Sequence, residues 1–336
     1  MKELISVILI GLMVLVILLH IVVAETSALP LQNTLSNSII VDGNPSEWGL
    51  YDCTYKAPGL YLETINDIPQ WIWCDPEGDE RTDFASPDLR ADLVQFRITA
   101  DENFLYGLII VKDMDFGSLG VSGATATLIT VNRNGTGNGE WFGLLSDTMI
   151  DGNAYWSWQI IINLGSAGIS GTSSSTGLAG SGMWGAPFYV VDASWNFIVD
   201  EVSLMAANIG YDTIEFMIAW STLGGVPGGP MFFLRLGLIT GRGYGNGEDY
   251  GDLWDIGGGY VSDALDAITT TGPNTWDEVG DGVVNYYIDL YFMTTPPYYP
   301  IPEPFILVPI AVIGALGTSL ALLLKKSRKM SSLISN

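Results

Sequence analysis

LVQFRITADENFLYGLIIV, residues 93–111, is the clearest structural signal in this chain. Apolar residues recur with a spacing of two on either side of the turn residues Asp101-Glu102-Asn103. Two alternating runs joined by a short polar turn are typical of an antiparallel β-hairpin. The central part of the chain is therefore predicted to be β-structure.

Similar short runs continue along the chain, and amphipathic helical patterns are scarce. Glycine and tryptophan are abundant, with 40 and 11 residues, whereas charged residues make up 15%. This composition suits many tight turns around a large core. The predicted fold class is all-β, a jelly-roll-like antiparallel β-sandwich over residues 39–295. Further strands are predicted at 124–131, 154–163, 187–191, 196–201, 211–219, 231–239 and 283–293, with residues 50–74 irregular and 165–182 a Gly/Ser-rich loop.

Two long apolar runs lie near the ends of the chain. Residues 1–24 are predicted to be a signal peptide, because Lys2 precedes an apolar run that ends at Ala24. An uncleaved anchor is the alternative. Residues 305–324 are apolar and, at about 1.5 Å per residue, long enough for one transmembrane helix. The predicted organisation also includes a linker (25–38), a Pro-rich juxtamembrane segment (296–304) and a basic cytoplasmic tail (325–336). This organisation places the sandwich at the cell surface, outside the membrane.

The C-terminal run also has characteristic flanks. Pro302-Glu303-Pro304 precedes it, and Lys325, Lys326, Arg328 and Lys329 follow it. This layout resembles the PEP-type C-terminal sorting signals on which exosortases and archaeosortases act. The resemblance implies a sortase-like processing enzyme as a partner and removal of the helix. A helix retained as a permanent anchor is the alternative.

The chain is strongly acidic and has very little histidine. It contains 37 Asp+Glu and 13 Lys+Arg, a formal net charge of −24, and its one histidine, His20, lies in the predicted signal peptide. Such a charge disfavours nucleic acid as a partner. A mature chain without histidine cannot form a Ser-His-Asp centre, a histidine-containing zinc site or a histidine-held haem site.

The predicted extracellular part carries two sites of covalent modification. Cys53 and Cys74 both lie in it, and disulfides persist in oxidising compartments, so a Cys53–Cys74 disulfide is predicted. Closing a loop of about twenty residues contributes on the order of 3 kcal/mol to stability. Asn134-Gly135-Thr136 is a glycosylation acceptor triplet on a predicted turn.

Several segments together have a familiar order. Val41-Asp42-Gly43-Asn44-Pro45-Ser46-Glu47-Trp48 forms a strand and turn, and EFMIAWSTLG at residues 215–224 is a late strand element. These segments resemble surface domains related to family 9 carbohydrate-binding modules and to DOMON domains, and residues 263–292 resemble the end of glucodextranase-type C-terminal domains. The resemblance implies a sandwich that binds sugars, often with calcium. Haem-binding DOMON relatives use axial Met or His, so no haem is expected here.

Acidic residues gather in two turn-rich segments. Asp75, Glu77, Asp79 and Glu80 form the denser group, and Asp249, Asp252 and Asp255 lie in a Gly-rich loop. Calcium binds six to eight oxygen atoms from carboxylates, carbonyls and water. The candidate calcium ligands are Asp75, Glu77, Asp79, Asp249 and Asp252, and no zinc is expected. Acids that simply face solvent are the alternative.

Tryptophans are the candidate sugar contacts, since an aromatic ring can stack on the apolar face of a pyranose. Trp141, Trp184 and Trp254 fall in predicted loops. Trp71 forms an i, i+2 pair with Trp73, a pattern that suits a sandwich core as well as a binding platform.

The predicted function is therefore that of a cell-surface-anchored, non-catalytic, carbohydrate-binding-module-like protein, assisted by Ca²⁺, with a glycan or polysaccharide as partner. A structural component of an envelope or surface layer is the alternative, because an acidic face could bind cations and neighbouring chains. A carboxylate-dependent glycoside hydrolase is the second alternative. No spacing singles out a carboxylate pair, so no catalytic residue is predicted.

Overall fold

A computed structural model of the protein describes most of the central region of the chain. The described residues are 39–81, 88–114, 124–133, 135–143, 147–165, 174–180, 186–198, 200, 202–228, 231–243, 263–268 and 282–293. The predicted signal peptide, linker, juxtamembrane segment, transmembrane helix and basic tail lie outside these residues. Within the described residues, no helix is both long and apolar enough to cross a membrane.

The first sheet has seven antiparallel strands in the order β1-β2-β3-β4-β13-β12-β9. Neighbours along the chain form its hairpins, and β13 returns beside β4 after a long excursion through the other sheet. The bounds are β1 Gly59–Ile65, β2 Ile68–Cys74, β3 Leu93–Ala100, β4 Phe104–Val111, β9 Ser174–Ala179, β12 Leu204–Asn208 and β13 Thr213–Ala219.

The second sheet also has seven strands, in the order β11-β10-β8-β5-β14-β15 with β17 paired to the first half of β14. Its bounds are β5 Ala124–Asn132, β8 Trp158–Asn163, β10 Phe188–Asp192, β11 Phe197–Ile198, β14 Met231–Gly243, β15 Asp266–Ala267 and β17 Ile288–Met293. A small third sheet joins β6 (Trp141–Phe142), β7 (Thr148–Ile150) and β16 (Val283–Val284), and η2 (Gly152–Ala154) is a 3-10 turn.

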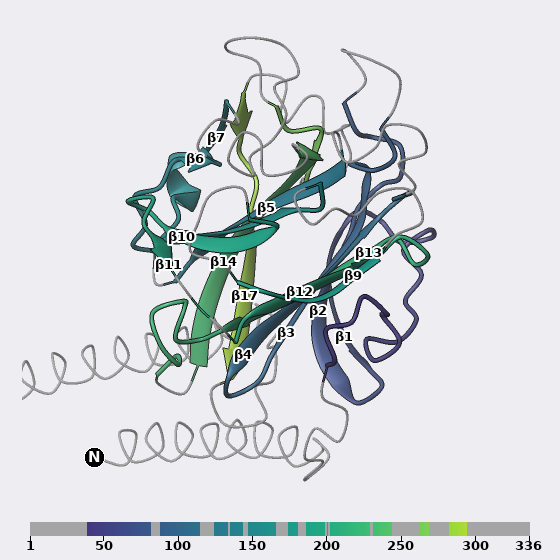
Figure 1. Ribbon diagram of the computed structural model, residues 1–336, viewed down its shortest axis with the longest axis horizontal. Coiled ribbons are helices and arrows are strands. Elements are labelled where there is room, and N and C mark those ends of the chain that lie inside the picture. The colour runs from purple at the N-terminus through teal and green to yellow at the C-terminus, as the bar shows by residue number, and fades with distance from the viewer. Residues whose placement is uncertain are drawn as a thin grey trace, which may run out of the picture. The chain divides into compact units, whose positions relative to one another are not determined.

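The two large sheets pack face to face, and the main core fills the space between them (Figure 1). Alternate residues of each strand point inward, as the spacing of two predicts. Phe232 on β14 illustrates the packing, because its ring lies 5.3 Å from Trp220 and 5.0 Å from Phe292, centroid to centroid. The prediction of an all-β sandwich with antiparallel sheets is confirmed for the described residues, and the predicted 93–111 hairpin is β3 and β4.

Two regions differ from the sequence-based prediction. Residues 50–74 were expected to be irregular, but Gly59–Ile65 and Ile68–Cys74 form the β1–β2 hairpin. Its turn is Asn66-Asp67, with φ values of 51° and 63°, and such left-handed two-residue turns match the twist of paired strands. Ser174–Ala179, expected to belong to a Gly/Ser-rich loop, pairs with β12 as β9.

Residues 39–58, which we call the N-terminal segment, cross the outer face of the first sheet without joining it as a strand. The strand expected at the start of the 41–48 motif is therefore not formed, because side chains of the sheet rather than a paired strand hold this backbone. Trp48 is fully buried there against Tyr106 and Leu108 of β4. Buried polar side chains of the sheet bind the backbone of this segment. Gln70 Nε2 donates to Trp48 O at 3.0 Å, Arg97 Nη1 to Gly49 O at 2.8 Å and Gln95 Nε2 to Tyr51 O at 2.7 Å.

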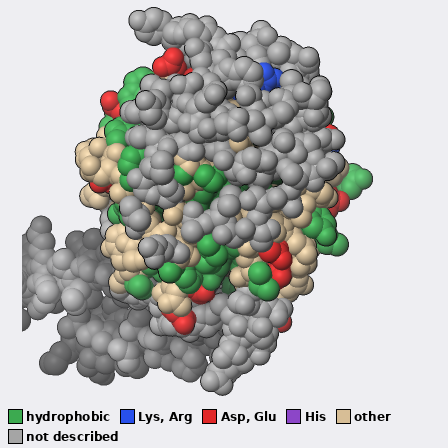
Figure 2. Space-filling view, viewed as in Figure 1, with side chains coloured by type: hydrophobic (Ala, Val, Ile, Leu, Met, Phe, Trp, Pro, Cys, Tyr) green, Lys and Arg blue, Asp and Glu red, His purple; other side chains and the backbone are tan. Residues whose placement is uncertain are grey.

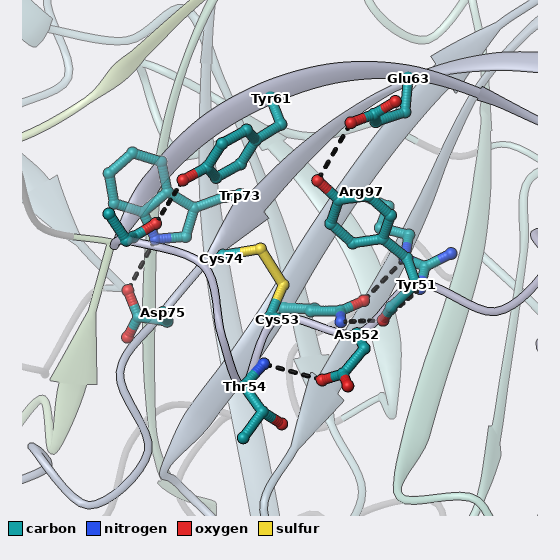
Figure 3. Close-up of a disulfide and its surroundings, with 12 residues drawn as sticks. Tyr51, Asp52, Cys53, Thr54, Tyr61, Glu63, Trp73, Cys74, Asp75 and Arg97 are labelled. Carbon is teal, nitrogen blue, oxygen red and sulfur yellow. Dashed lines mark hydrogen bonds between the residues drawn. A yellow bond between two sulfur atoms is a disulfide. The ribbon is translucent and has the colours of Figure 1, made fainter.

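A disulfide near the C-terminal end of the N-terminal segment links this segment to the first sheet. Cys53 is bonded to Cys74, the last residue of β2, with 5.5 Å between their Cα atoms (Figure 3). The predicted pairing is therefore confirmed. Both cysteines are buried and pack with Ile72 in a small apolar cluster.

Candidate metal centre and exposed aromatic patch

Three carboxylates from distant parts of the chain meet at one edge of the sandwich. Asp75 follows β2 directly, Asp79 lies in the next turn, and Asp266 belongs to β15 of the second sheet. One oxygen atom of each lies within 4.8 Å of those of the other two. Asp75 and Asp266 are buried, and Asp79 is half-buried.

Backbone hydrogen bonds explain why these residues come together. Leu93 N, at the start of β3, donates to Asp266 Oδ2 at 2.7 Å, which ties the first sheet to the second. Asp75 N donates to Val94 O at 3.1 Å, and Gly78 N donates to Asp92 Oδ2 at 2.9 Å. The turn after Asp75 is thereby held against the beginning of β3, and Gly78 adopts a φ of 82° that favours glycine.

Two further acids, Glu80 and Asp92, are buried beside this group with exposed fractions of 4% and 1%. We call Asp75, Asp79, Glu80, Asp92 and Asp266 the acidic cluster. Several of its buried oxygens accept no hydrogen bond from the described residues. They are Asp75 Oδ2, both oxygens of Asp79, both oxygens of Glu80 and Asp92 Oδ1. A buried polar atom without a partner is costly, so such a group calls for a counter-ion.

The electrostatics of the cluster lead to the same conclusion. Burial, together with the charge of Asp79, raises the pKa of Asp75 well above its usual value, although Trp73 Nε1 opposes this by donating to Oδ1 at 2.6 Å. Burial raises the pKa of Asp79 to about 7, and burial with the charge of Glu80 raises that of Asp92 to about 7. A bound cation would offset this repulsion and keep the carboxylates ionised.

The donor set fits a hard cation. It consists of carboxylate oxygens. Calcium binds six to eight oxygen atoms in flexible geometry, whereas zinc prefers nitrogen and sulfur. Asp75, Asp79 and Asp266 would hold the ion, with Glu80 and Asp92 as further donors.

The structure brings together part of the predicted calcium ligand set. Asp75 and Asp79 lie in the acidic cluster, whereas Glu77 is exposed and forms an ion pair with Lys112. Asp249 and Asp252 lie outside the described residues. Asp266 and Asp92 were missed because only strand pairing brings them to the turn, although Asp92, directly before the clear strand signal at Leu93, offered a local cue.

A pocket of about 300 Å³ lies beside the disulfide and next to the acidic cluster. Asp75 belongs to both, since it lines the pocket and contributes to the cluster. Figure 3 shows Asp75 near the disulfide, where it accepts a hydrogen bond from Trp73. Thr54, Lys56, Pro58, Glu77 and Val94 also line the pocket.

Of the predicted sugar contacts, Trp141 on β6 is exposed to 38%. Its neighbour Glu140 accepts a hydrogen bond from the Tyr155 hydroxyl at 3.3 Å. Trp156 lies beneath, because its Nε1 donates to Trp141 O at 3.1 Å and its ring meets that of Trp195 edge to face at 5.3 Å. We call Trp141, Glu140 and Tyr155 the aromatic patch.

The other predicted site residues are not exposed or not described. Trp71 is buried in the main core and its Nε1 donates to Tyr291 O at 3.4 Å, so its ring offers no free face to a sugar. The i, i+2 spacing with Trp73 therefore reflects core packing. Trp184, Trp254 and the glycosylation candidate Asn134 lie outside the described residues.

Acidic side chains appear at several places on the face shown in Figure 2, and basic ones are scarce there among the coloured residues. This agrees with the strong negative charge of the whole sequence. The calcium candidate differs from these surface acids because its oxygens are buried.

Comparison with known proteins gives a limited result. No protein-family model matches the chain, and no curated protein matches it. Among solved structures, a family 9 carbohydrate-binding module from Caldicellulosiruptor kristjanssonii in complex with cellotriose is similar over 60% of this chain and 72% of its own, at 12% identity and a TM-score of 0.27. A similarity at this level is too weak to assign a ligand or a site.

Proposed function

We propose that this protein is a non-catalytic β-sandwich that binds carbohydrate, holds calcium in its acidic cluster, and is displayed at the cell surface. The proposal is carried by the buried carboxylate oxygens that accept no hydrogen bond from any residue in the described part of the chain. Acidic residues that only keep a surface soluble are expected to be exposed to solvent, whereas carboxylates that bind calcium are expected to be buried together around the ion.

The aromatic patch supports carbohydrate as the ligand. An exposed tryptophan beside a tyrosine–glutamate hydrogen bond offers an apolar ring for a pyranose face and polar groups for its hydroxyls. The predicted terminal segments support display outside a membrane.

Calcium should raise the melting temperature of the purified protein, and a chelator should reverse the effect. At one hundred times its Kd, a ligand specific for the folded state stabilises by about 2.7 kcal/mol. Asp79→Asn should reduce this response, while raising stability without calcium because it removes a charge from the cluster.

Asp67→Asn makes the same chemical change at an exposed turn position, so it should respond to calcium as the wild type does. A melting temperature that is unchanged by calcium in the wild-type protein would contradict the proposed cation site.

Glycan binding should depend on the ring of Trp141. We expect Trp141→Ala to weaken binding on a glycan array by at least about tenfold, with little loss of stability because the side chain is partly exposed. Tyr211→Ala serves as the control, because it removes an aromatic ring exposed to 52% from the turn between β12 and β13 of the first sheet. Equal weakening by both variants, or no glycan bound at all, would argue against the aromatic patch and leave a structural surface role as the better explanation.

A further inference from the structure

The pocket beside the disulfide and the acidic cluster share one side chain. Asp75 lines the pocket, and it is also one of the three carboxylates whose oxygens lie within 4.8 Å of one another. Its Oδ1 accepts from Trp73 Nε1, whereas Oδ2 accepts no hydrogen bond from the described residues, although the residue is only 5% exposed. A cation held by the cluster would therefore lie next to the wall of this pocket.

Some oxygens of the acidic cluster are already engaged in hydrogen bonds within the protein. Two oxygens of Asp266 already accept from Leu93 N and Ala267 N, both at 2.7 Å, and Asp92 Oδ2 accepts from Gly78 N. Calcium binds six to eight oxygens and commonly completes its shell with water. Coordination positions on the pocket side are therefore available to water or to oxygens of a ligand.

The walls of the pocket match the two kinds of surface on a sugar. Pro58 and Val94 are apolar, as are the C–H faces of a pyranose ring. Lys56 and Thr54 are polar, and the Lys56 ammonium is held 5.2 Å from the ring centroids of both Tyr51 and Tyr61. At about 300 Å³ the pocket is at the lower end of the range for ligand sites, so it suits one sugar unit rather than a length of chain.

We infer that a cation held by Asp75, Asp79 and Asp266 also binds the ligand directly, through two neighbouring hydroxyl groups of a single sugar unit in this pocket. The inference rests on the proposed cation site and is separate from the aromatic patch. Two adjacent hydroxyl oxygens would replace water on the ion, and Lys56 would donate a hydrogen bond to a third oxygen. The chemical class of the ligand is thus a terminal pyranose with a free vicinal diol.

The test is calorimetric titration of the full chain with methyl α-mannopyranoside and methyl β-galactopyranoside, in excess calcium and again in chelator. Tetrahydropyran-2-methanol keeps the ring but lacks the hydroxyl pair, so it serves as the negative probe. We expect at least one glycoside to bind in calcium, and we expect that binding to be lost in chelator.

Variants in the pocket test whether the sugar binds there. Val94→Trp fills the pocket and should weaken glycoside binding at least about tenfold. Val202→Trp places the same side chain at a position exposed to 52% and is the matched control. Lys56→Met should weaken binding without changing the response of the melting temperature to calcium.

The outcomes distinguish the two proposals. If calcium raises the melting temperature but neither glycoside binds, or if binding is the same in chelator, the inference is overturned and the cation site stands. If calcium neither stabilises the protein nor supports binding, both are overturned. Binding that Val94→Trp leaves intact would also overturn the inference, because the sugar would then lie elsewhere.

Discussion

Glu215 shows how one buried carboxylate can organise a surface segment. It is fully buried on β13, and its oxygens accept from Asp42 N at 3.0 Å, Gly43 N at 2.7 Å and Trp48 Nε1 at 2.9 Å. Burial raises its pKa to about 7, although these three donors act in the opposite direction. With both oxygens engaged and no exposure to solvent, Glu215 is poorly placed to act as a catalytic acid.

The raised pKa of Glu215 predicts a pH-dependent contribution to stability. The folded state binds the proton more tightly than the unfolded state, whose carboxyl has the ordinary value of 4.5. The stabilising contribution of this group is therefore complete below pH 4.5 and is lost as the pH rises to about 7, by an amount on the order of 1–3 kcal/mol. The difference in unfolding free energy between wild type and Glu215→Gln, measured by denaturant titration from pH 4 to 8, should vary across this window.

Glu215→Gln should also destabilise the protein at every pH. An amide cannot accept from all three donors at once, and a buried donor left without a partner costs about 1–3 kcal/mol. Glu102→Gln is the control, because Glu102 is exposed in a turn. If the difference in unfolding free energy between wild type and Glu215→Gln does not change with pH, the pKa of Glu215 is not raised. The three hydrogen-bond donors would then lower this pKa at least as much as burial raises it.

Sequence reasoning at the residue scale could group only residues that lie close together in the chain. Asp75 and Asp79 belong to one acidic turn, so a local pattern predicted their place in the cluster. Asp266 lies far along the chain and reaches the same point through β15, which no local pattern reveals. Trp71 was predicted to contact a sugar but is buried in the core. The spacing of two shows that Trp71 and Trp73 lie on one face of a strand, but it does not show whether that face contacts solvent or the other sheet.

Among the elements, β4 and β13 depend on a glycine for their close pairing. Gly107 lies opposite Phe216, and a Cβ at Gly107 would come within 2.0 Å of Phe216 Cζ. The ring fills the space that a side chain would need. Both strands lie in the middle of the first sheet, so a clash here would affect the main core.

Gly107→Ala should therefore destabilise the protein by about 1–3 kcal/mol, the usual cost of overpacking a core. Adding Phe216→Leu should cost less in this background than in the wild type, since the shorter side chain relieves the clash. Thermal or denaturant unfolding of the four proteins measures this coupling. Gly228→Ala is the control, because a Cβ there would meet nothing within 4 Å. Additive effects of the two core changes would exclude the proposed clash.

Strands with a strong alternating pattern were predicted with close to their observed bounds, as β3, β4 and β13 show. The β1–β2 hairpin was missed because its aromatic and polar residues hide the alternation, although Asn66-Asp67 is a turn signal that a closer reading would have used. β9 was missed because glycine and serine favour loops, and here pairing with β12 overrides that preference.

At the scale of the whole molecule, the acidic cluster joins the two sheets. Asp75 follows β2 in the first sheet, Asp266 lies on β15 in the second, and Leu93 N bridges them through Asp266. A cation at this edge would add an attractive link where like charges otherwise repel. The negative charge of the whole sequence was evident from its composition, but the seam where the sheets meet could be located only once the strand order was known.

The disulfide gives this molecule a defined response to mechanical force. A load applied at Ile39 acts first on the N-terminal segment, which side-chain contacts hold to the sheet. Peeling it as far as Asp52 would free a segment whose fully extended length is roughly 50 Å, at about 3.5 Å per residue, so the gain in length would be smaller than this. At Cys53 the load passes through the covalent bond to Cys74 and into β2, so extension should pause there. In optical-tweezers experiments, the double variant Cys53→Ala/Cys74→Ala should lose this pause. If the wild-type protein extends in a single step, the N-terminal segment does not detach before the sandwich unfolds. If the protein is displayed outside the cell as proposed, such a segment would extend under a sudden pull before the sandwich itself is strained.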